Sequence, residues 1–190
     1  MSKIFYTGKG DNGKSFIGKN KIDKTSWEIK TLGKIDELNS LIGVIRNFKI
    51  SKKNKEILLD IQNDLFVIQA LVARLIVDEK LKQKTKDLNF GIDKIEKLES
   101  LINKLSEKLG NQTQFIIYGS NLESALFDYL RAVTRETELN LWQLNKSLGK
   151  TKKLKSEILK YVNRLSFLFY VLARYQAKIK NIKEQHPNYK

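Results

Sequence analysis

Hydrophobic residues recur every three or four positions along most of this chain, and this spacing predicts helices. Between residues 23 and 45 the hydrophobic positions are Trp27, Leu32, Ile35, Leu38, Leu41, Ile42 and Ile45. They fall on one face of an α-helix, so the segment is amphipathic. The same spacing predicts further helices over residues 52–78, 91–110, 120–148 and 152–182, the fourth with Ser120 or Asn121 as its N-cap. Five such helices joined by short links are typical of an all-α antiparallel bundle.

The segments outside these helices differ in composition. Residues 1–22 are glycine-rich, since four of the ten glycines lie within residues 8–18, and they show no helical period. We therefore expect an N-terminal loop there. Residues 79–90 are expected to form a mobile loop, and the apolar residues 115–118 are expected to be extended. The prediction is one domain over residues 1–190, with the loop at 1–22 and the helical bundle at 23–182.

Composition narrows the chemistry that the chain can perform. Of its 190 residues 41% are hydrophobic, which is enough for a full core, and no run of 18 apolar residues predicts a membrane span. The first residues lack the apolar stretch of a signal peptide, so we expect a cytoplasmic protein. Cysteine is absent and His186 is the single histidine, which excludes thiolate chemistry and argues against metal sites made by His or Cys. Any reaction is expected to depend on positioning and anion stabilisation rather than on proton transfer.

The net charge of +15 predicts attraction to polyanions such as nucleic acid, phosphorylated ligands or anionic lipid. The lysines are interleaved with acidic residues, as in residues 94–97, rather than gathered on one helix face. This pattern favours solvated helix surfaces. A basic helical protein that binds nucleic acid is therefore the weakest of the functional alternatives, because no reading motif accompanies the charge.

The N-terminal loop carries the first candidate motif. Its residues are Thr7, Gly8, Lys9, Gly10, Asp11, Asn12, Gly13, Lys14 and Ser15. Closely spaced glycines allow backbone N–H groups to converge on an anion, and the lysines and hydroxyls suit a triphosphate. The spacing is not that of a P-loop. A flexible turn without a ligand remains an equal interpretation of the glycines alone.

Charged residues on two of the predicted helices form the second and third motifs. Arg131, Arg135 and Glu138 share one face of the fourth helix, where they need carboxylate or phosphate partners or else form a surface pair between Arg135 and Glu138. Asp36 borders the apolar stripe of the first helix. It is either a solvated residue or the partner of an arginine, and we expect an ion pair with Arg131, within a subunit or across an oligomer.

The fourth motif, residues 161–166, places Asn163 and Arg164 between apolar residues of the last helix. The amide of Asn163 both donates and accepts hydrogen bonds, so it suits adenine or ribose, although a buried structural amide is the commoner role.

Taken in this order, the motifs resemble the propanediol-utilisation type of ATP:cob(I)alamin adenosyltransferase. The resemblance rests on residues 7–15, Lys24, residues 33–40, Phe115 with Gly119, the Arg131–Arg135–Glu138 face, and residues 161–166 followed by Arg174. It implies a five-helix bundle and a homotrimer that binds ATP between subunits. The implied reaction is attack of Co(I) on C5′ of ATP, which gives adenosylcobalamin and releases triphosphate. Mg²⁺ bound through ATP, with help from Glu138, accompanies it.

The resemblance also assigns roles to residues. Those implied for catalysis are Asp36, Phe115, Arg131 and Arg135, and those implied for ATP binding are Thr7, Gly8, Lys9, Gly10, Asp11, Gly13, Lys14, Ser15, Lys24, Arg135, Glu138 and Asn163. Phe115 is expected to lie under the corrin and to favour four-coordinate Co(II); the alternative is that it is a core residue. A transient reductase and an adenosylcobalamin-dependent acceptor enzyme are the implied partners.

The chain departs from the family pattern at a few positions. Glu136 and Leu139 stand where arginine is usual, Phe167 replaces an aspartate, and residues 118–120 replace a Pro-Gly-Gly turn. The alternative function is a non-catalytic protein of the same fold that binds ATP and a corrinoid for delivery or regulation. Retention of Asp36, Arg131, Arg135 and Phe115 favours the enzyme.

Overall fold

A computed structural model describes residues 6, 8–76, 88–149 and 152–189. Within these residues, five long helices and one small hairpin make up the regular structure, so the predicted all-α bundle is confirmed. The helices are α1 (Trp27–Arg46), α2 (Lys52–Arg74), α4 (Ile92–Leu109), α5 (Leu122–Ser147) and α6 (Ser156–Ile179). The hairpin consists of β1 (Lys14–Ile17) and β2 (Asn20–Asp23).

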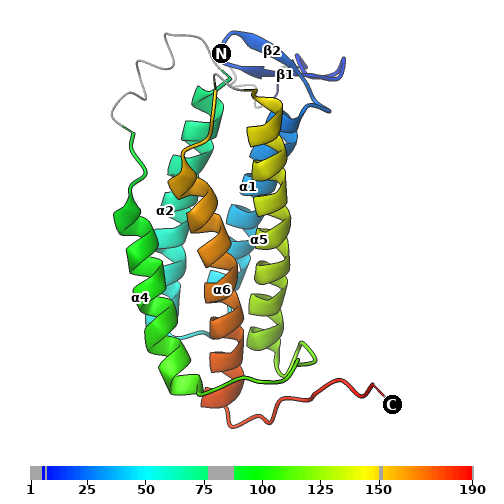
Figure 1. Cartoon of the computed structure of the whole chain (residues 1–190). Coiled ribbons are helices and arrows are strands. Elements are labelled where there is room, and N and C mark those ends of the chain that lie inside the picture. Colours follow the sequence, from blue (N-terminus) through cyan, green and yellow to red (C-terminus); the bar gives the residue numbers. More distant parts are fainter. Residues whose placement is uncertain (1–5, 7, 77–87, 150–151, 190) are drawn as a thin grey trace.

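The helices run alternately up and down the bundle, and the hairpin lies at the opposite end from the C-terminal tail (Figure 1). Around the bundle, α1 packs against α2 and α5, and α6 packs against α5 and α4. Ion pairs of Lys94 with Asp64 and of Lys97 with Asp60 join α4 to α2, with N–O distances of 2.9 and 2.8 Å. The helix order is therefore α2–α1–α5–α6–α4, closed by these side chains.

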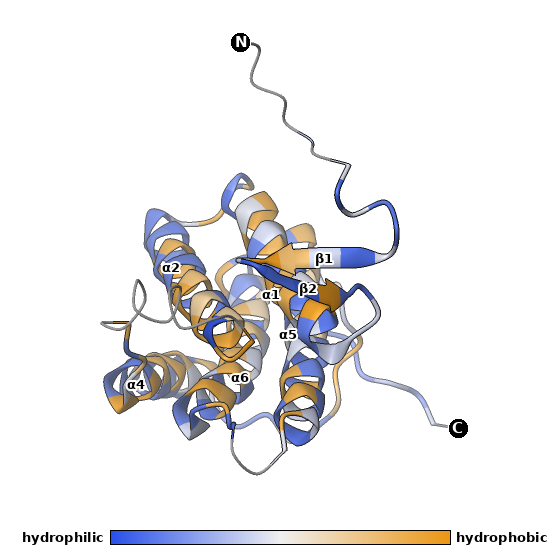
Figure 2. Cartoon of the chain, turned by 90° about the horizontal axis from the view of Figure 1, so that it is seen from above, coloured by the Kyte–Doolittle hydropathy of each residue, from blue (hydrophilic) through white to orange (hydrophobic). Residues whose placement is uncertain are grey.

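The predicted hydrophobic stripes form the core. Figure 2 shows the hydrophobic residues of the helices turned toward one another. Fully buried members include Ile35, Leu38, Leu65, Phe127 and Leu165. Among the described residues, no helix is long and apolar enough to cross a membrane.

The predicted start of the first helix, Asp23, is wrong, because α1 begins at Trp27. The hydroxyl of Ser26 accepts a hydrogen bond from the N–H of Ile29 and caps the helix. Asp23 instead belongs to β2, and its carboxylate accepts from the backbone and hydroxyl of Thr25. The hydrophobic period was correct, but the cap decides where the helix starts.

The N-terminal segment is partly a hairpin rather than a loop throughout. Ile17 pairs with Asn20 across a two-residue turn in which Gly18 has φ of 60°. A positive φ at the first turn position is typical of a type II′ turn, which matches the twist of paired strands. The strands are too short for a visible alternation of hydrophobic and polar residues, so the prediction missed them.

The remaining boundaries are close to those predicted. The third helix has Gly91 and Gly110 at its two caps, and Asn121, not Ser120, caps α5 by accepting from the N–H of Ser124. The last helix, predicted over 152–182, is shorter at both ends, and the second ends before the predicted residue 78. Most of the predicted loop 79–90 lies outside the described residues. Its end is packed rather than mobile, because Phe90 is buried against Tyr161 with 4.9 Å between ring centroids.

Candidate active site

Three of the four residues implied for catalysis line one cavity of about 390 Å³. Phe115, Arg131 and Arg135 all contribute to its wall. The segment before α5 forms one side, and the facing surfaces of α5 and α6 form the other. The remaining lining residues are Gln112, Thr113, Gln114, Ile116, Tyr118, Ser166, Phe167 and Tyr170. The arginine face of α5 and the segment that carries Phe115 therefore lie at the same cavity.

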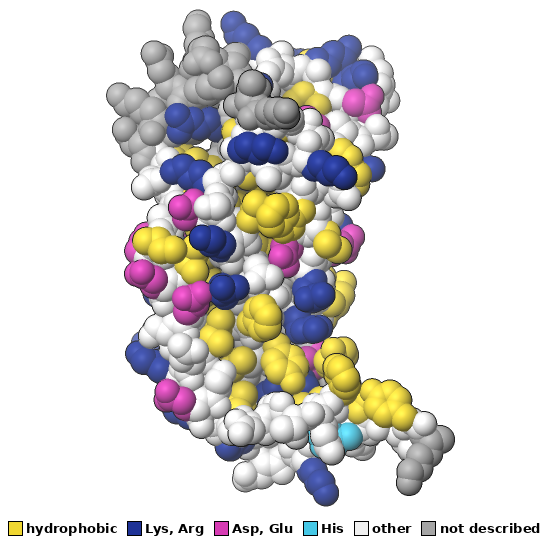
Figure 3. All heavy atoms as spheres, in the orientation of Figure 1, with side chains coloured by type: hydrophobic (Ala, Val, Ile, Leu, Met, Phe, Trp, Pro, Cys, Tyr) yellow, Lys and Arg dark blue, Asp and Glu magenta, His cyan; other side chains and the backbone are white. Residues whose placement is uncertain are grey.

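Phe115 is a surface residue, so the interpretation as core is wrong. Its side chain is 78% exposed, and Tyr118 and Phe167 are also exposed beside the cavity. Hydrophobic side chains gather on the lower part of the molecular face that Figure 3 shows. Exposed aromatic rings around a cavity suit a large apolar ligand better than a small polar one.

Arg131 is held between two tyrosine rings. Its guanidinium lies 5.6 Å from the ring centroid of Tyr118 and 5.9 Å from that of Tyr170. Such stacking fixes the plane of a guanidinium while leaving its N–H groups available. Burial raises the pKa of the Tyr170 hydroxyl above its usual range. The chain-specific Tyr118, which stands in place of a proline, thus helps to orient an expected catalytic arginine.

The predicted ion pair between Asp36 and Arg131 does not form within this chain. Asp36 is exposed on α1, and Arg131 contacts the two tyrosines instead. The physical reason is the register of α1 against α5, in which Thr31 donates to the carbonyl of Asn140 and Asp36 points outward. The version of the prediction that crosses a subunit boundary remains a prediction.

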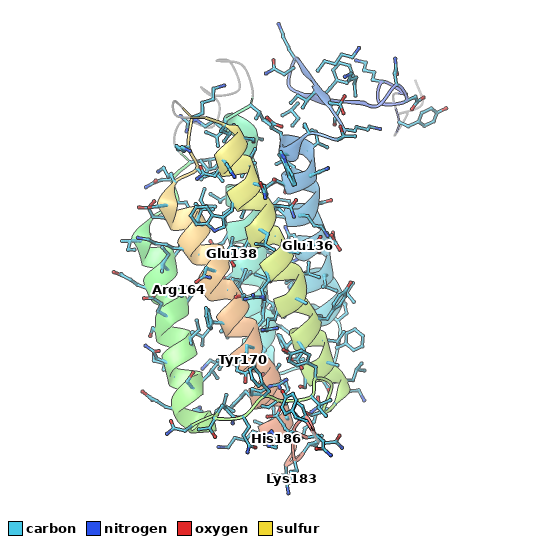
Figure 4. All side chains as sticks on the ribbon, turned by 45° about the vertical axis from the view of Figure 1, so that its right-hand side comes forward. Glu136, Glu138, Arg164, Tyr170, Lys183 and His186 are labelled. Atoms are coloured by element: carbon cyan, nitrogen blue, oxygen red, sulfur yellow. The ribbon has the colours of Figure 1, made fainter. Side chains whose placement is uncertain are left out.

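A polar chain of four side chains begins at Glu138, one turn from Arg135 on α5. Asn163 donates to Glu138 at 3.1 Å and accepts from Arg164 at 2.8 Å, and Arg164 pairs with Glu99 at 2.8 Å. Figure 4 labels Glu138 on α5 and Arg164 on α6 at neighbouring levels. The alternative surface pair between Arg135 and Glu138 is wrong, since Glu138 binds Asn163 and Arg135 is exposed. The amide of Asn163 is oriented by this chain.

Glu136, one of the departures from the family pattern, binds a neighbouring helix. Its carboxylate lies 2.8 Å from the ammonium of Lys34, which also contacts Glu37 at 2.8 Å. The hydrogen bond to Glu136, and to a smaller extent the one to Glu37, raises the pKa of the Lys34 ammonium. The acidic substitution therefore links α5 to α1 and does not face the cavity.

The glycine-rich loop is at the other end of the bundle from Phe115. Lys24 approaches the backbone of Gly10 closely, since a side chain added there would meet its ammonium at 3.1 Å. Lys14 pairs with Asp23 at 2.9 Å, so its charge is partly neutralised. Gly8 and Gly13 have φ of 65° and 72°, a conformation that favours glycine. No described residue of the loop lines the cavity near Arg135.

Other loop residues named above are also accounted for. Lys9 and Asp11 are exposed, Ser15 lies on β1 opposite Ile22, and Thr7 lies outside the described residues. Lysines and glycines are thus concentrated around one turn, as an anion site requires, but none of its described residues lines the cavity that holds Arg131 and Arg135.

A buried charge cluster near the cavity was missed by the sequence reasoning. Arg174 is 1% exposed and donates to the carboxylate of Asp128 at 2.5 Å, and its Nε lies 3.1 Å from Glu184. Burial raises the pKa of both Asp128 and Glu184, while the Arg174 charge opposes the rise. The sequence marks Arg174 only as the last residue of a family motif. Its partner Glu184 could not be predicted, because it lies beyond the end of the last predicted helix.

The fold and the cavity define a helical-bundle protein with arginines and exposed aromatic rings at one site. The chain belongs to the cobalamin adenosyltransferase family, whose sequence pattern matches residues 5–176. A corrinoid adenosyltransferase from Citrobacter freundii is 34% identical over 170 residues, covering 89% of this chain and 92% of the relative. One from Bacillus subtilis (strain 168) is 31% identical over 169 residues, covering 89% and 84%.

Solved structures support the fold. A variant of a PduO-type ATP:corrinoid adenosyltransferase from Lactobacillus reuteri, complexed with cobalamin and ATP, superimposes with a TM-score of 0.83 at 23% identity. The match covers 97% of this chain and 99% of that one. The family resemblance drawn from the sequence and the expected enzyme class, a transferase, are therefore confirmed.

Proposed function

We propose that this chain transfers the 5′-deoxyadenosyl group of ATP to the Co(I) of a reduced corrinoid. The family match over residues 5–176 carries this proposal. The cavity supports it, because Phe115 of the segment before α5 and Arg131 and Arg135 of α5 surround one space. A non-catalytic delivery protein would not need two arginines at the site where a leaving group must be stabilised.

In this reaction the cobalt electron pair of Co(I) forms the Co–C bond to C5′ as the C5′–O bond to triphosphate breaks. No proton is transferred, which agrees with a site without histidine or cysteine chemistry. The protein must hold C5′ in line with cobalt and stabilise negative charge on the leaving triphosphate. We assign charge stabilisation to Arg135 with Lys24 and the loop around residues 8–15, and recognition of adenosine to Asn163.

The exposed aromatic side of the cavity is assigned to the corrinoid. Phe115 would contact the lower face of the corrin and exclude water and an axial base, which favours four-coordinate Co(II) and eases its reduction. Arg131, fixed between its two tyrosines, lies at the border between the apolar and the cationic parts of the site.

Mg²⁺ is proposed to enter with ATP. In the part of the chain that the structure describes, no group of three or more Asp, Glu, His or Cys residues is placed to hold a metal ion. A hard cation such as Mg²⁺ commonly keeps its waters and binds through nucleotide phosphates with one carboxylate. Glu138 is the carboxylate that we assign, since it lies one turn from Arg135 on α5.

A homotrimer with ATP between subunits is proposed because each chain holds the two halves of the ATP site apart. The loop with Lys24 is at one end of the bundle, and the cavity with Arg135 does not include it. Asp36, exposed on α1, would then pair with Arg131 of a neighbouring subunit. We further propose a cytoplasmic location, a transient reductase that supplies electrons to the corrinoid, and an acceptor enzyme that uses adenosylcobalamin.

The proposed function is tested by an anaerobic assay of Co–C bond formation. Purified protein, MgATP and chemically reduced cobalamin should give the spectrum of adenosylcobalamin with one triphosphate released per corrinoid. Binding of both substrates without bond formation would instead support the delivery protein.

A further inference from the structure

The C-terminal tail crosses the segment that carries Phe115, at the lower end of the bundle (Figures 1 and 4). The N–H of Ile117 donates to the carbonyl of Gln185 at 2.8 Å. The Nδ1 atom of His186 lies 2.9 Å from the carbonyl oxygen of Phe115. A carbonyl oxygen only accepts, so Nδ1 is the donor in this contact. The two bonds lie on either side of Ile116.

The tail is itself anchored in the bundle through Glu184. The Glu184 carboxylate lies 3.1 Å from Nε of the buried Arg174, and the hydroxyl of Ser120 lies 3.5 Å from the same carboxylate oxygen. Arg174 is in turn fixed by Asp128 of α5. Glu184, the residue before Gln185, is therefore tied to α6 by charge through Arg174 and to the segment before α5 by the hydroxyl of Ser120.

These contacts decide which side chain of the segment faces the bundle. In an extended backbone successive side chains point to opposite sides. Here Ile116 is 7% exposed, whereas Phe115 is 78% exposed. The hydrophobic effect favours burial of the larger Phe115 ring instead. Backbone bonds at residues 115 and 117 oppose that rotation, since turning the segment over would break both.

We infer that Glu184 and His186 are positioning residues for the corrinoid step, because they hold Phe115 outward at the rim of the cavity. The inference rests on the proposed function. Neither residue lines the cavity, so neither contacts the reacting atoms directly. They act through the backbone of the 115–117 segment, on the side of the site that faces the corrinoid and away from the glycine-rich loop.

The test compares His186→Ala with His186→Gln, whose amide can donate in place of Nδ1. Lys183→Ala is the matched control, because Lys183 is exposed in the same tail and makes no hydrogen bond or ion pair with any described residue. Two quantities are measured on each variant with MgATP. One is the fraction of bound corrinoid present as four-coordinate Co(II), read from its electron paramagnetic resonance spectrum. The other is kcat/KM for ATP with pre-formed Co(I).

We expect His186→Ala to lower the ratio of four-coordinate to five-coordinate Co(II) about fivefold, the effect of losing one hydrogen bond. The kcat/KM for ATP should stay within about twofold of wild type, as for a change that leaves ATP contacts intact. His186→Gln should restore most of the Co(II) signal, and Glu184→Gln should lower it if the variant stays folded. Because His186 is exposed, its variants test the inference even if Glu184→Gln unfolds.

If the wild-type protein is active, so that the proposed function holds, either of two results would overturn the inference. One is a Co(II) spectrum of His186→Ala that matches wild type and Lys183→Ala. The other is a parallel loss of Co(II) signal, ATP kcat/KM and melting temperature, which indicates a structural role only. A wild-type protein that transfers nothing from ATP to pre-formed Co(I) would overturn the proposed function, and this inference with it.

Discussion

At the end of the bundle that carries the hairpin, glycines and lysines surround an open turn, and Lys24 and Lys9 extend from exposed backbone. At the opposite end, one cluster of charges is paired and shielded from water: Arg174 binds Asp128 and Glu184, and the tail is bonded to the 115–117 segment. The cavity at the first end, between the end of α2 and the start of α6, includes no described residue of the glycine-rich turn. The second has a walled cavity whose apolar rim is fixed by the chain's own tail.

This difference indicates that the two substrates are bound by different means. The apolar side of the site, assigned to the corrinoid, is assembled within one chain. The cationic loop, assigned to triphosphate, does not line the cavity with Arg135, which is why we propose that a second copy completes the anion site. Changes at the buried end should therefore affect stability, whereas changes at the arginine face and the loop should affect ATP.

The largest effect on stability is expected from Arg174→Met. The change leaves Asp128 and Glu184 in place without their counter-charge, and removing one partner of a buried pair destabilises by about 3–5 kcal/mol. Unfolding in urea measures it. The control is Arg164→Met, because its pair with Glu99 is partly exposed and should contribute at most about 1 kcal/mol. Equal losses in the two variants would contradict the contrast between buried and exposed charge.

Arg135→Ala should have the next largest effect, on catalysis rather than on folding. Loss of one charge stabiliser of a leaving group lowers kcat/KM by about 10²–10³-fold. Arg135 is exposed, so the free energy of unfolding should change by no more than about 0.5 kcal/mol. Steady-state kinetics with varied ATP test this, with Lys160→Ala on the exposed face of α6 as a control. An unchanged kcat/KM would remove Arg135 from the ATP site.

Much of this arrangement was predictable from sequence, and the limits have physical causes. The spacing of hydrophobic residues predicted all five helices, because each helix buries one face and this burial sets the spacing. The family resemblance named Phe115, Arg131 and Arg135 as site residues, and the structure brings them to one cavity; their roles stay predictions. The hairpin was missed because strands as short as β1 and β2 carry little pattern. The Arg174–Glu184 pair was missed because it joins α6 to a tail without periodicity. Whether Asp36 meets Arg131 within one chain depends on helix register, which is a tertiary property, so only their pairing across subunits stays a prediction.

Phe115→Ala is expected to lower the rate from Co(II) with a mild reductant by about tenfold, equivalent to about 1.4 kcal/mol in the barrier. Without the ring, a fifth ligand can return to Co(II) and hinder its reduction. ATP affinity should stay near normal, and pre-formed Co(I) should restore much of the rate because reduction is bypassed. Since Phe115 is exposed, melting temperature should barely change. A large loss of stability without rescue by Co(I) would return Phe115 to a packing role.

Glu136→Gln should have the smallest effect. The Lys34–Glu136 pair is partly exposed, so its loss should lower the free energy of unfolding by less than about 1 kcal/mol, and less still in high salt. The folded-state pKa of Lys34 is raised above 10.5. The pair's contribution is therefore fully present below that pH and is lost as pH rises through the raised pKa. Urea unfolding of wild type and Glu136→Gln is compared at neutral pH and at high pH. The difference in free energy of unfolding should shrink at high pH, and a difference that grows with pH would be inconsistent with this pairing.

Mixed oligomers test most directly whether the ATP site is divided between two chains. Lys24→Ala and Arg135→Ala proteins, each with little activity alone, are unfolded together, refolded and assayed anaerobically with MgATP and Co(I) cobalamin. If a site takes its loop from one subunit and its arginine from the next, random assembly leaves roughly a quarter of sites with both halves intact. The account predicts that roughly this share of wild-type activity returns in the mixture, but not when Arg135→Ala is mixed with Asn163→Ala, which impairs the same half. Activity in the first mixture that stays at the level of the separate variants would contradict a shared site.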